Sequence, residues 1–221
     1  MITMTKQPRT LLLLLAGCLT AGIAGASTIA FDNAAAISPV QGFGGELGLD
    51  FTVNSAITID QLGAFDNGIV ANLAGADGHS GVTIQIYNIT STPVAIGPSV
   101  TFTPTNAGTQ INGDAFLSVS PFTLGVGRYT VVAVNDDNYN TLGTANTTST
   151  ENTDGGLITF SGSSRYSVST SSFPAQPDGG PNNRYDAGTF SFGAAAAPEP
   201  STFVLFGLGG ALAFFARRRR A

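Results

Sequence analysis

The sequence has very few of the side chains that carry nucleophilic or metal-binding chemistry. It contains one cysteine (Cys18), one histidine (His79), one lysine (Lys6) and no tryptophan. From Ser27 onwards there is neither a thiol nor a side-chain primary amine. A cysteine nucleophile, a Schiff-base lysine and a Cys/His zinc site are therefore excluded from that part of the chain. Disulfide bonds are excluded there for the same reason.

Charge is also scarce, and most of it has one sign. Charged residues make up 10% of the chain, well below the usual quarter. Between Ser27 and Ala197, three arginines (Arg128, Arg165 and Arg184) stand against 13 acidic residues, which gives this part a net charge of −10. Such an acidic surface repels nucleic acid and has no electrostatic attraction for anionic lipid. We therefore expect no nucleic-acid partner.

Residues 1–26 have the pattern of a secretory signal peptide. Basic residues lie within the first ten positions, the apolar segment Leu11–Ile23 follows, and Ala24 and Ala26 place small side chains at the −3 and −1 positions. The apolar segment is too short to span a membrane comfortably. The pattern predicts cleavage by signal peptidase after Ala26, which makes Ser27 the first residue of the exported chain.

A second cleavage pattern overlaps the first. Leu15-Ala16-Gly17-Cys18 is similar to the lipobox of bacterial lipoproteins, in which the cysteine becomes the acylated first residue. Cleavage there would leave only Leu11–Leu15 as a strongly apolar core, which is shorter than the usual apolar segment of a leader. We therefore interpret Cys18 as a small apolar residue inside the leader. Lipidation of Cys18 stays the alternative.

The middle of the chain, residues 27–193, has the pattern of an all-β domain. In Val82–Tyr87 and in Arg128–Val134, apolar and polar side chains alternate with a period of two, which indicates half-buried antiparallel strands. Turn-forming Gly, Asn, Asp and Pro separate such runs. This predicts an antiparallel β-sandwich, jelly-roll-like in architecture. The expected strands are 28–31, 49–53, 57–65, 81–89, 99–102, 115–119, 128–135, 156–160 and 189–192.

Two segments of the middle, and the four residues that follow it, are expected to lie outside the sheets. Asn140–Asp154 is rich in Thr and Asn and predicts a long loop. Ser161–Asn183 is rich in Ser, Pro and Gly, and most of it is too polar to pack in a core. Residues 194–197, before the C-terminal tail, are expected to form a spacer.

The last 24 residues, 198–221, have three parts. Pro198, Glu199, Pro200 and Ser201 form a short polar motif. An apolar segment follows, predicted as a single transmembrane helix over 202–216, and then a basic cluster made of Arg217, Arg218, Arg219 and Arg220. The uncharged run Ser201–Ala216 measures about 24 Å as a helix. It is short for a bilayer core of about 30 Å, but flanking arginines can extend to the interface. The basic cluster predicts that the C-terminus is cytoplasmic and the middle domain is outside.

This order of motif, apolar span and arginine cluster resembles the PEP-CTERM sorting signal of Gram-negative bacteria, which is also labelled an ice-binding-protein C-terminal domain. The resemblance implies recognition by exosortase, a membrane-embedded cysteine transpeptidase, and cleavage at or near Pro198–Pro200. The implied membrane anchor is temporary, and the released protein goes to the cell surface or into exopolysaccharide. Residues 48–66 and 78–87 are similar to uncharacterised β-sandwich domains found on such proteins, which implies the fold and no site.

The search for a catalytic or metal site finds little. Asp77, His79 and Ser80 are too close in sequence to align as a catalytic triad, and Ser80 lacks the Gly-x-Ser-x-Gly frame. Asp136-x-Asn138 begins like a calcium loop, but the following positions lack the required Gly and Glu. Turn formation explains both groups better. We expect no catalytic residue and no cofactor, and we keep Asp136 and Asn138 as the candidate Ca²⁺ ligands.

Two functions from different classes agree with this sequence. The first is an exported, non-catalytic protein of the cell surface or the exopolysaccharide matrix. The second is an extracellular module that binds glycans or Ca²⁺, with tyrosines lining a sugar-binding face. The candidate tyrosines are Tyr87, Tyr129, Tyr139, Tyr166 and Tyr185. A hydrolase that uses Asp or Glu is disfavoured because no carboxylate pair is marked.

Overall fold

The structure is a computed structural model, and it describes residues 27–33, 45–66, 81–103, 105–134, 140–141, 149–169, 173–180 and 182–196. Within these ranges the regular secondary structure consists of β-strands. They contain no helix of the length and apolarity that crossing a membrane requires. The predicted signal peptide (1–26) and transmembrane helix (202–216) lie outside the described residues.

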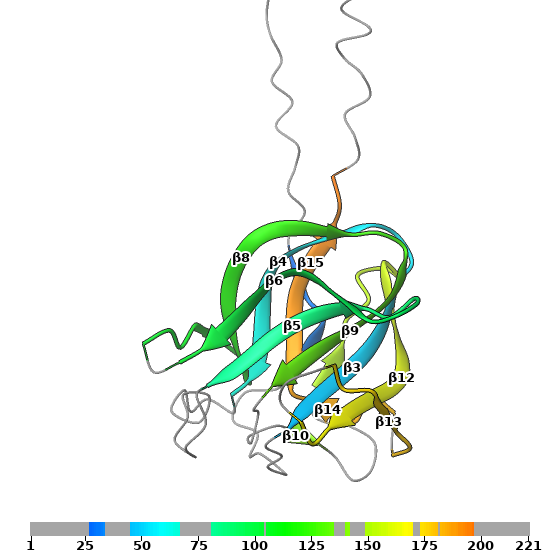
Figure 1. The fold of residues 1–221 in the computed structure, drawn as a ribbon. Helices are drawn as coiled ribbons and strands as arrows, with labels where there is room; N and C mark the ends of the chain where they lie inside the picture. Colours follow the sequence, from blue (N-terminus) through cyan, green and yellow to red (C-terminus); the bar gives the residue numbers. More distant parts are fainter. Residues whose placement is uncertain are drawn as a thin grey trace, which may run out of the picture.

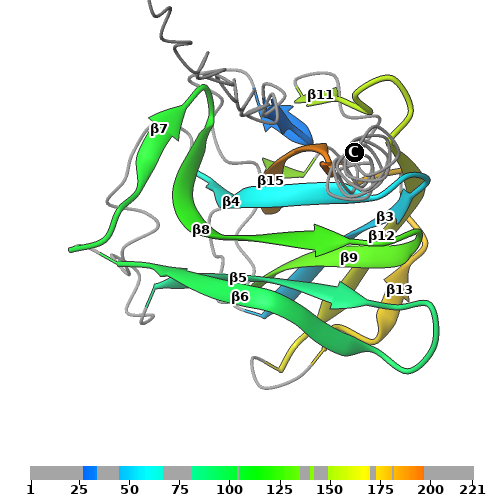
Figure 2. The ribbon, with the colours of Figure 1, turned by 90° about the horizontal axis from the view of Figure 1, so that it is seen from above.

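Most of the strands form two antiparallel sheets that lie face to face (Figures 1 and 2). The first sheet has the order β1-β15-β4-β8-β7 and the second has the order β13-β12-β3-β9-β5-β6; β2 pairs with β11, and β10 with β14. The prediction of an all-β antiparallel fold is confirmed. The strands are β1 (Thr28–Ile29), β2 (Phe31–Asn33), β3 (Glu46–Val53), β4 (Ile57–Phe65), β5 (Val82–Asn88), β6 (Val94–Phe102), β7 (Thr109–Ile111), β8 (Asp114–Leu124), β9 (Gly127–Val134), β10 (Asn140–Thr141), β11 (Ser149–Glu151), β12 (Ile158–Ser167), β13 (Gln176–Asp178), β14 (Tyr185–Asp186) and β15 (Gly188–Ala194).

The hydrophobic core lies between the two sheets and follows the predicted alternation. Val82, Ile84 and Ile86 of β5 point inward and are buried, while the residues between them are only partly buried. Phe51 and Phe190 meet in this core with ring centroids 4.8 Å apart. Since burying a large apolar side chain contributes about 1.5–3 kcal/mol, this sandwich-like packing supplies most of the stability that the chain obtains without disulfides.

Two of the three segments expected outside the sheets contain strands. Ser161–Asn183 includes the second half of β12 and all of β13, and Asn140–Asp154 includes β10 and β11. Those loop predictions are wrong over these strands. The reason is that β12 and β13 lie at the border of the second sheet, where one face is covered and polar residues such as Ser161 and Ser163 can point to the other side. A strand exposed in this way needs few apolar residues.

The first and last strands of the domain pair with each other. Thr28 of β1 lies opposite Phe192 of β15, and β15 in turn pairs with β4 along most of its length. β15 includes Ala194, which was predicted to belong to the spacer. The N–H of the next residue, Ala195, donates to the C=O of Ala56 at 3.0 Å. Both ends of the described domain therefore leave it at the same edge.

The edge strand β6, and the part of β8 beyond its pairing with β7, each carry a proline in a bulge. In β6 the pairing with β5 shifts around Gly97-Pro98-Ser99, and in β8 the pairing with β4 shifts around Val119-Ser120-Pro121. Proline has no N–H to offer a further strand, and bulges interrupt the regular edge. Both features disfavour edge-to-edge pairing between copies of the domain.

Candidate functional site

The chain leaves the domain toward its C-terminal tail beside three turns. Ala194 pairs with Ile57, Ile57 pairs with Leu124, and Val53 pairs with Gly127, so the β3–β4 and β8–β9 turns lie next to the exit of the chain. The N–H of Asn54 donates to the C=O of Leu157 at 2.8 Å, which adds a third turn. We call this region the tail-proximal end and define it as residues 54–56, 125–127, 153–157 and 195–196.

The tail-proximal end is nearly free of charge. Asp154 is its one ionisable side chain, and it lies on an exposed turn. Between Gly125 and Gly127, the side chain of Val126 is 74% exposed, although valine is usually buried. The glycines on either side cover none of it. Single exposed apolar side chains are common on protein surfaces. Val126 is distinguished by its position beside the exit of the chain.

Carboxylates gather at the opposite, distal end of the strands. Glu46 begins β3, Asp66 follows β4, and Asp114 begins β8. Asp114 accepts hydrogen bonds from the backbone N–H of Asn33 at 3.0 Å and from its side-chain amide at 2.8 Å. The amide of Asn112 donates to both carboxylate oxygens of Asp32. These contacts tie β2 to the β7–β8 turn, so Asp32 and Asp114 act in folding.

Asp66 differs from its neighbours because its carboxylate has no hydrogen-bond partner. The residue is fully buried and both carboxylate oxygens are without a partner, while its backbone N–H donates to the C=O of Gly113 at 2.9 Å. Burial without compensation disfavours the charged form and raises the pKa of Asp66 from 3.8 to about 6. A carboxyl of this kind lowers the stability of the folded domain when it ionises.

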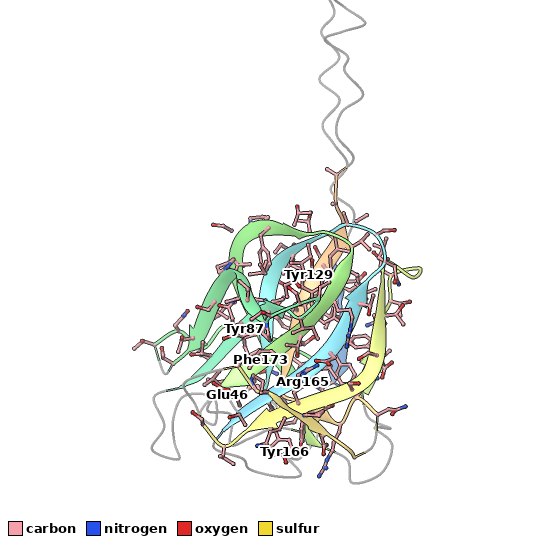
Figure 3. The ribbon with its side chains drawn as sticks, turned by 45° about the vertical axis from the view of Figure 1, so that its right-hand side comes forward. Glu46, Tyr87, Tyr129, Arg165, Tyr166 and Phe173 are labelled. Carbon is pink, nitrogen blue, oxygen red and sulfur yellow. The ribbon has the colours of Figure 1, made fainter. Side chains whose placement is uncertain are left out.

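A second cluster lies on the outer face of the second sheet (Figure 3). The Nε of Arg165 donates to the two carboxylate oxygens of buried Asp50 at 2.7 and 3.0 Å. The Arg165 guanidinium lies 5.5 Å from the centre of the Phe173 ring, and that ring meets Tyr87 edge to face at 5.2 Å. Burial, and then the negative charge of Glu46, raise the pKa of the Tyr87 hydroxyl. We call these five residues the outer-face cluster.

The outer-face cluster holds the segment before β13 against the sheet. Pro174, next to Phe173, is buried and lies over Gly48, where a Cβ atom would come within 3.4 Å of the proline ring. Arg165 uses its guanidinium for both Asp50 and Phe173. The outer-face cluster therefore fixes this segment against the second sheet, and we call this arrangement the clamp. Tyr87 and Phe173 stay partly exposed at its surface.

The candidate tyrosines do not form one sugar-binding face. Tyr87 lies on the outer face, whereas Tyr129 points inward and stacks on Phe51 at 5.7 Å. Tyr185 is buried beside Arg184, and Figure 3 places Tyr166 well apart from Tyr87. Tyr139 lies outside the described residues. Only Tyr87 therefore contributes to the outer-face cluster.

Most of the predicted site residues lie outside the part of the chain that the structure describes. These are Ala24, Ala26, Asp136, Asn138, Pro198, Glu199, Pro200, Ser201, Arg217, Arg218, Arg219 and Arg220. Ser27, the predicted first residue after cleavage, is exposed, and its hydroxyl donates to Asp60 at 2.7 Å. Among the described residues, no group of three or more His, Cys, Asp or Glu side chains is arranged to hold a metal ion.

Sequence reasoning missed two features of this arrangement. The pairing of β1 with β15 depends on residues that are more than 160 positions apart, and no local pattern announces it. The exposure of Val126 had a local signal, because a lone valine between two glycines is typical of a tight turn rather than a strand.

The described residues form an all-β domain, and a family match places a sorting signal directly after its last strand. Residues 196–220 match the family model of the PEP-CTERM protein-sorting motif, and this segment of the chain is such a motif. No curated protein and no solved structure matches the chain significantly. The match begins one residue after Ala195, the last residue with a backbone hydrogen bond to the domain.

Proposed function

We propose that this protein is an exported, non-catalytic protein whose β-sandwich passenger is delivered to the cell surface or the exopolysaccharide matrix by its sorting signal. The match at residues 196–220 carries this proposal. Signal peptidase removes residues 1–26, the segment 202–216 holds the precursor in the inner membrane with the passenger in the periplasm, and an exosortase-type enzyme then cuts near Pro198–Pro200. The membrane anchor is thus temporary.

The position of the tail supports a cut that leaves the fold intact. Every described strand ends at or before Ala194, and the N–H of Ala195 donates to the C=O of Ala56 just after the last pairing. The sorting motif starts only three residues further on, at Pro198. A cut at the motif therefore keeps all the described strands and their core side chains. The released product keeps the two sheets and both paired end strands.

The non-catalytic part of the proposal is supported by the way the described carboxylates are used. Asp50 is bound to Arg165, Asp114 to Asn33, Asp32 to Asn112, and Glu151 accepts from Asn183. A general acid or base must instead reach a substrate. Asp66 lacks a partner, but it is fully buried.

The alternative function, a module that binds glycans or Ca²⁺, has one observation in its favour. Tyr87 and Phe173 form a partly exposed aromatic pair next to Arg165, and aromatic rings beside charged groups suit a sugar ring and its hydroxyls. A glycan array followed by calorimetry tests it, together with calorimetry against Ca²⁺. Glycan binding that is lost in Tyr87→Ala and kept in Tyr166→Ala would establish the glycan function. If the array gives no hits and calorimetry gives no heat, the display function is the one that stands.

The proposed sorting is tested by fractionation of the native host with and without its exosortase. The passenger is detected by an epitope tag that is inserted after Ser27. We expect passenger at the surface or in the matrix of the parent strain and in the inner membrane of the deletion strain. Replacement of Pro198 and Pro200 by alanine should reproduce the deletion, whereas Ala196→Ser serves as the neighbouring control. Equal distribution in all strains would remove the proposal.

A further inference from the structure

We propose that the tail-proximal end rests on the lipid bilayer while the precursor is still anchored, with the side chain of Val126 entering the interfacial region. This inference rests on the proposed function, because it requires the segment 202–216 to span the membrane. It adds a defined orientation of the passenger and a surface that contacts lipid.

The length of the connecting chain limits how far this end can lie from the membrane. The described residues end at Ala196, and the proposed span begins at Thr202. The six Cα–Cα steps between these two residues reach at most about 22 Å when fully extended. The exit of the chain lies beside Ala56 and Leu124, so the turns of the tail-proximal end are the part of the domain next to this short connection. Figure 1 shows β4, β8 and β15 converging at this edge.

The chemistry of the tail-proximal end suits a lipid surface. Val126 is 74% exposed, and Asp154 is the one ionisable side chain among the residues that make up this end. An amphipathic interface accepts small polar and apolar groups, whereas carboxylates lose hydration there. The next charged side chain after the β8–β9 turn is Arg128, a cation that is exposed. A basic side chain near the bilayer is attracted to anionic headgroups.

The distal end offers a matched comparison for Val126. Val168 is 82% exposed, and it follows Ser167, which pairs with Glu46 at the distal end of the strands. The two valines have the same side chain and nearly the same exposure, and they lie at opposite ends of the domain. A contact that depends on orientation must distinguish them.

The absence of cysteine from Ser27 onwards allows a direct test with single-cysteine variants. Val126→Cys and Val168→Cys of the chain 27–221 are labelled with an environment-sensitive dye and reconstituted in vesicles of phosphatidylcholine and phosphatidylglycerol that contain a spin-labelled quencher lipid. We expect a blue shift and quenching at position 126 and neither at position 168. A third sample, the Val126→Cys chain ending at Ala196, should lose both signals because it has no tail. Circular dichroism checks that each variant is folded.

The possible results separate this inference from the function on which it rests. Resistance of the chain to alkaline extraction reports whether the tail spans the bilayer, and failure there would overturn both proposals. Stable insertion with equal spectra at positions 126 and 168 would overturn only the lipid contact. A signal at position 126 that requires exosortase in the vesicles would also overturn it, and would assign the tail-proximal end to the enzyme.

Discussion

Phe122 of β8 packs its ring directly against the backbone of Gly97 of β6. A Cβ atom at position 97 would lie 2.5 Å from the nearest ring carbon, and Gly97 has a φ of 70°, in the left-handed region. The two residues belong to different sheets and lie next to the two proline-containing bulges. Gly97 thus allows the edges of the two sheets to approach each other, and the Phe122 ring fills the space that results.

This relationship predicts a large effect of a single methyl group. Gly97→Ala should destabilise the passenger by about 2–4 kcal/mol, because the side chain overpacks against Phe122 and strains a positive φ. Gly155→Ala is the matched control: Gly155 has a φ of 68° but no atom within 4 Å of its Cβ position, so it carries the backbone cost alone. Urea unfolding measures both. Equal losses of unfolding free energy in Gly97→Ala and Gly155→Ala would show that the contact with Phe122 plays no part.

The buried carboxyl of Asp66 predicts a stability that depends on pH. Its pKa is 3.8 in the unfolded chain and about 6 in the fold, so well below pH 3.8 it is protonated in both states and costs nothing extra. Between these two pKa values the unfolded chain releases the proton while the folded state keeps it, so about 2–3 kcal/mol of stability is lost as the pH rises from about 4 to 6, and the loss stays constant above that. Asp66→Asn should therefore stabilise the domain at pH 7.5 and change little at pH 3.5.

The control for Asp66 is Asp154→Asn, at an exposed turn where the φ of 45° suits asparagine as well as aspartate. Unfolding curves recorded from pH 3.5 to 7.5 for the parent and the two variants test this account. If Asp66→Asn follows the parent at every pH, the carboxyl is not responsible.

The clamp formed by Arg165 predicts the consequence of leaving Asp50 unpaired. Arg165→Ala should cost about 3 kcal/mol, because a buried carboxylate loses its cation. Arg184→Ala removes a pair that is more exposed, with Asp178, and should cost less than about 1 kcal/mol. Because Arg165 also holds Phe173, limited proteolysis near residue 173 should accelerate more in Arg165→Ala than in Arg184→Ala, whose contact is at the far end of the segment. Equal proteolysis in both variants would contradict the clamp.

Local patterns in the sequence predict the strands whose two faces differ. Ile57–Phe65 was predicted with the bounds that the structure has, and the inward side of Val82, Ile84 and Ile86 was predicted correctly. Local patterns do not predict burial by residues that are far away in the sequence. The polar segment around Ser163 becomes a strand because β3 and β13 flank it, and Asp66 is buried by packing that no neighbouring residue indicates.

The tail is the opposite case, since its motif, apolar segment and arginines are contiguous. Local sequence was sufficient to predict its class, and the family match at residues 196–220 confirms it. The point where the chain leaves the domain toward the tail needed the structure, because the exit beside Ala56 depends on how β15 pairs with β4.

The most direct test of the central claim is the intact mass of the exported protein, measured in the parent host and in a strain without exosortase. The account predicts a chain in the parent that begins at Ser27 and ends between Pro198 and Pro200. It predicts a chain in the deletion strain that begins at Ser27 and keeps Arg217–Arg220. A mass that includes the arginine cluster in both strains would contradict the claim that this tail is a processed sorting signal.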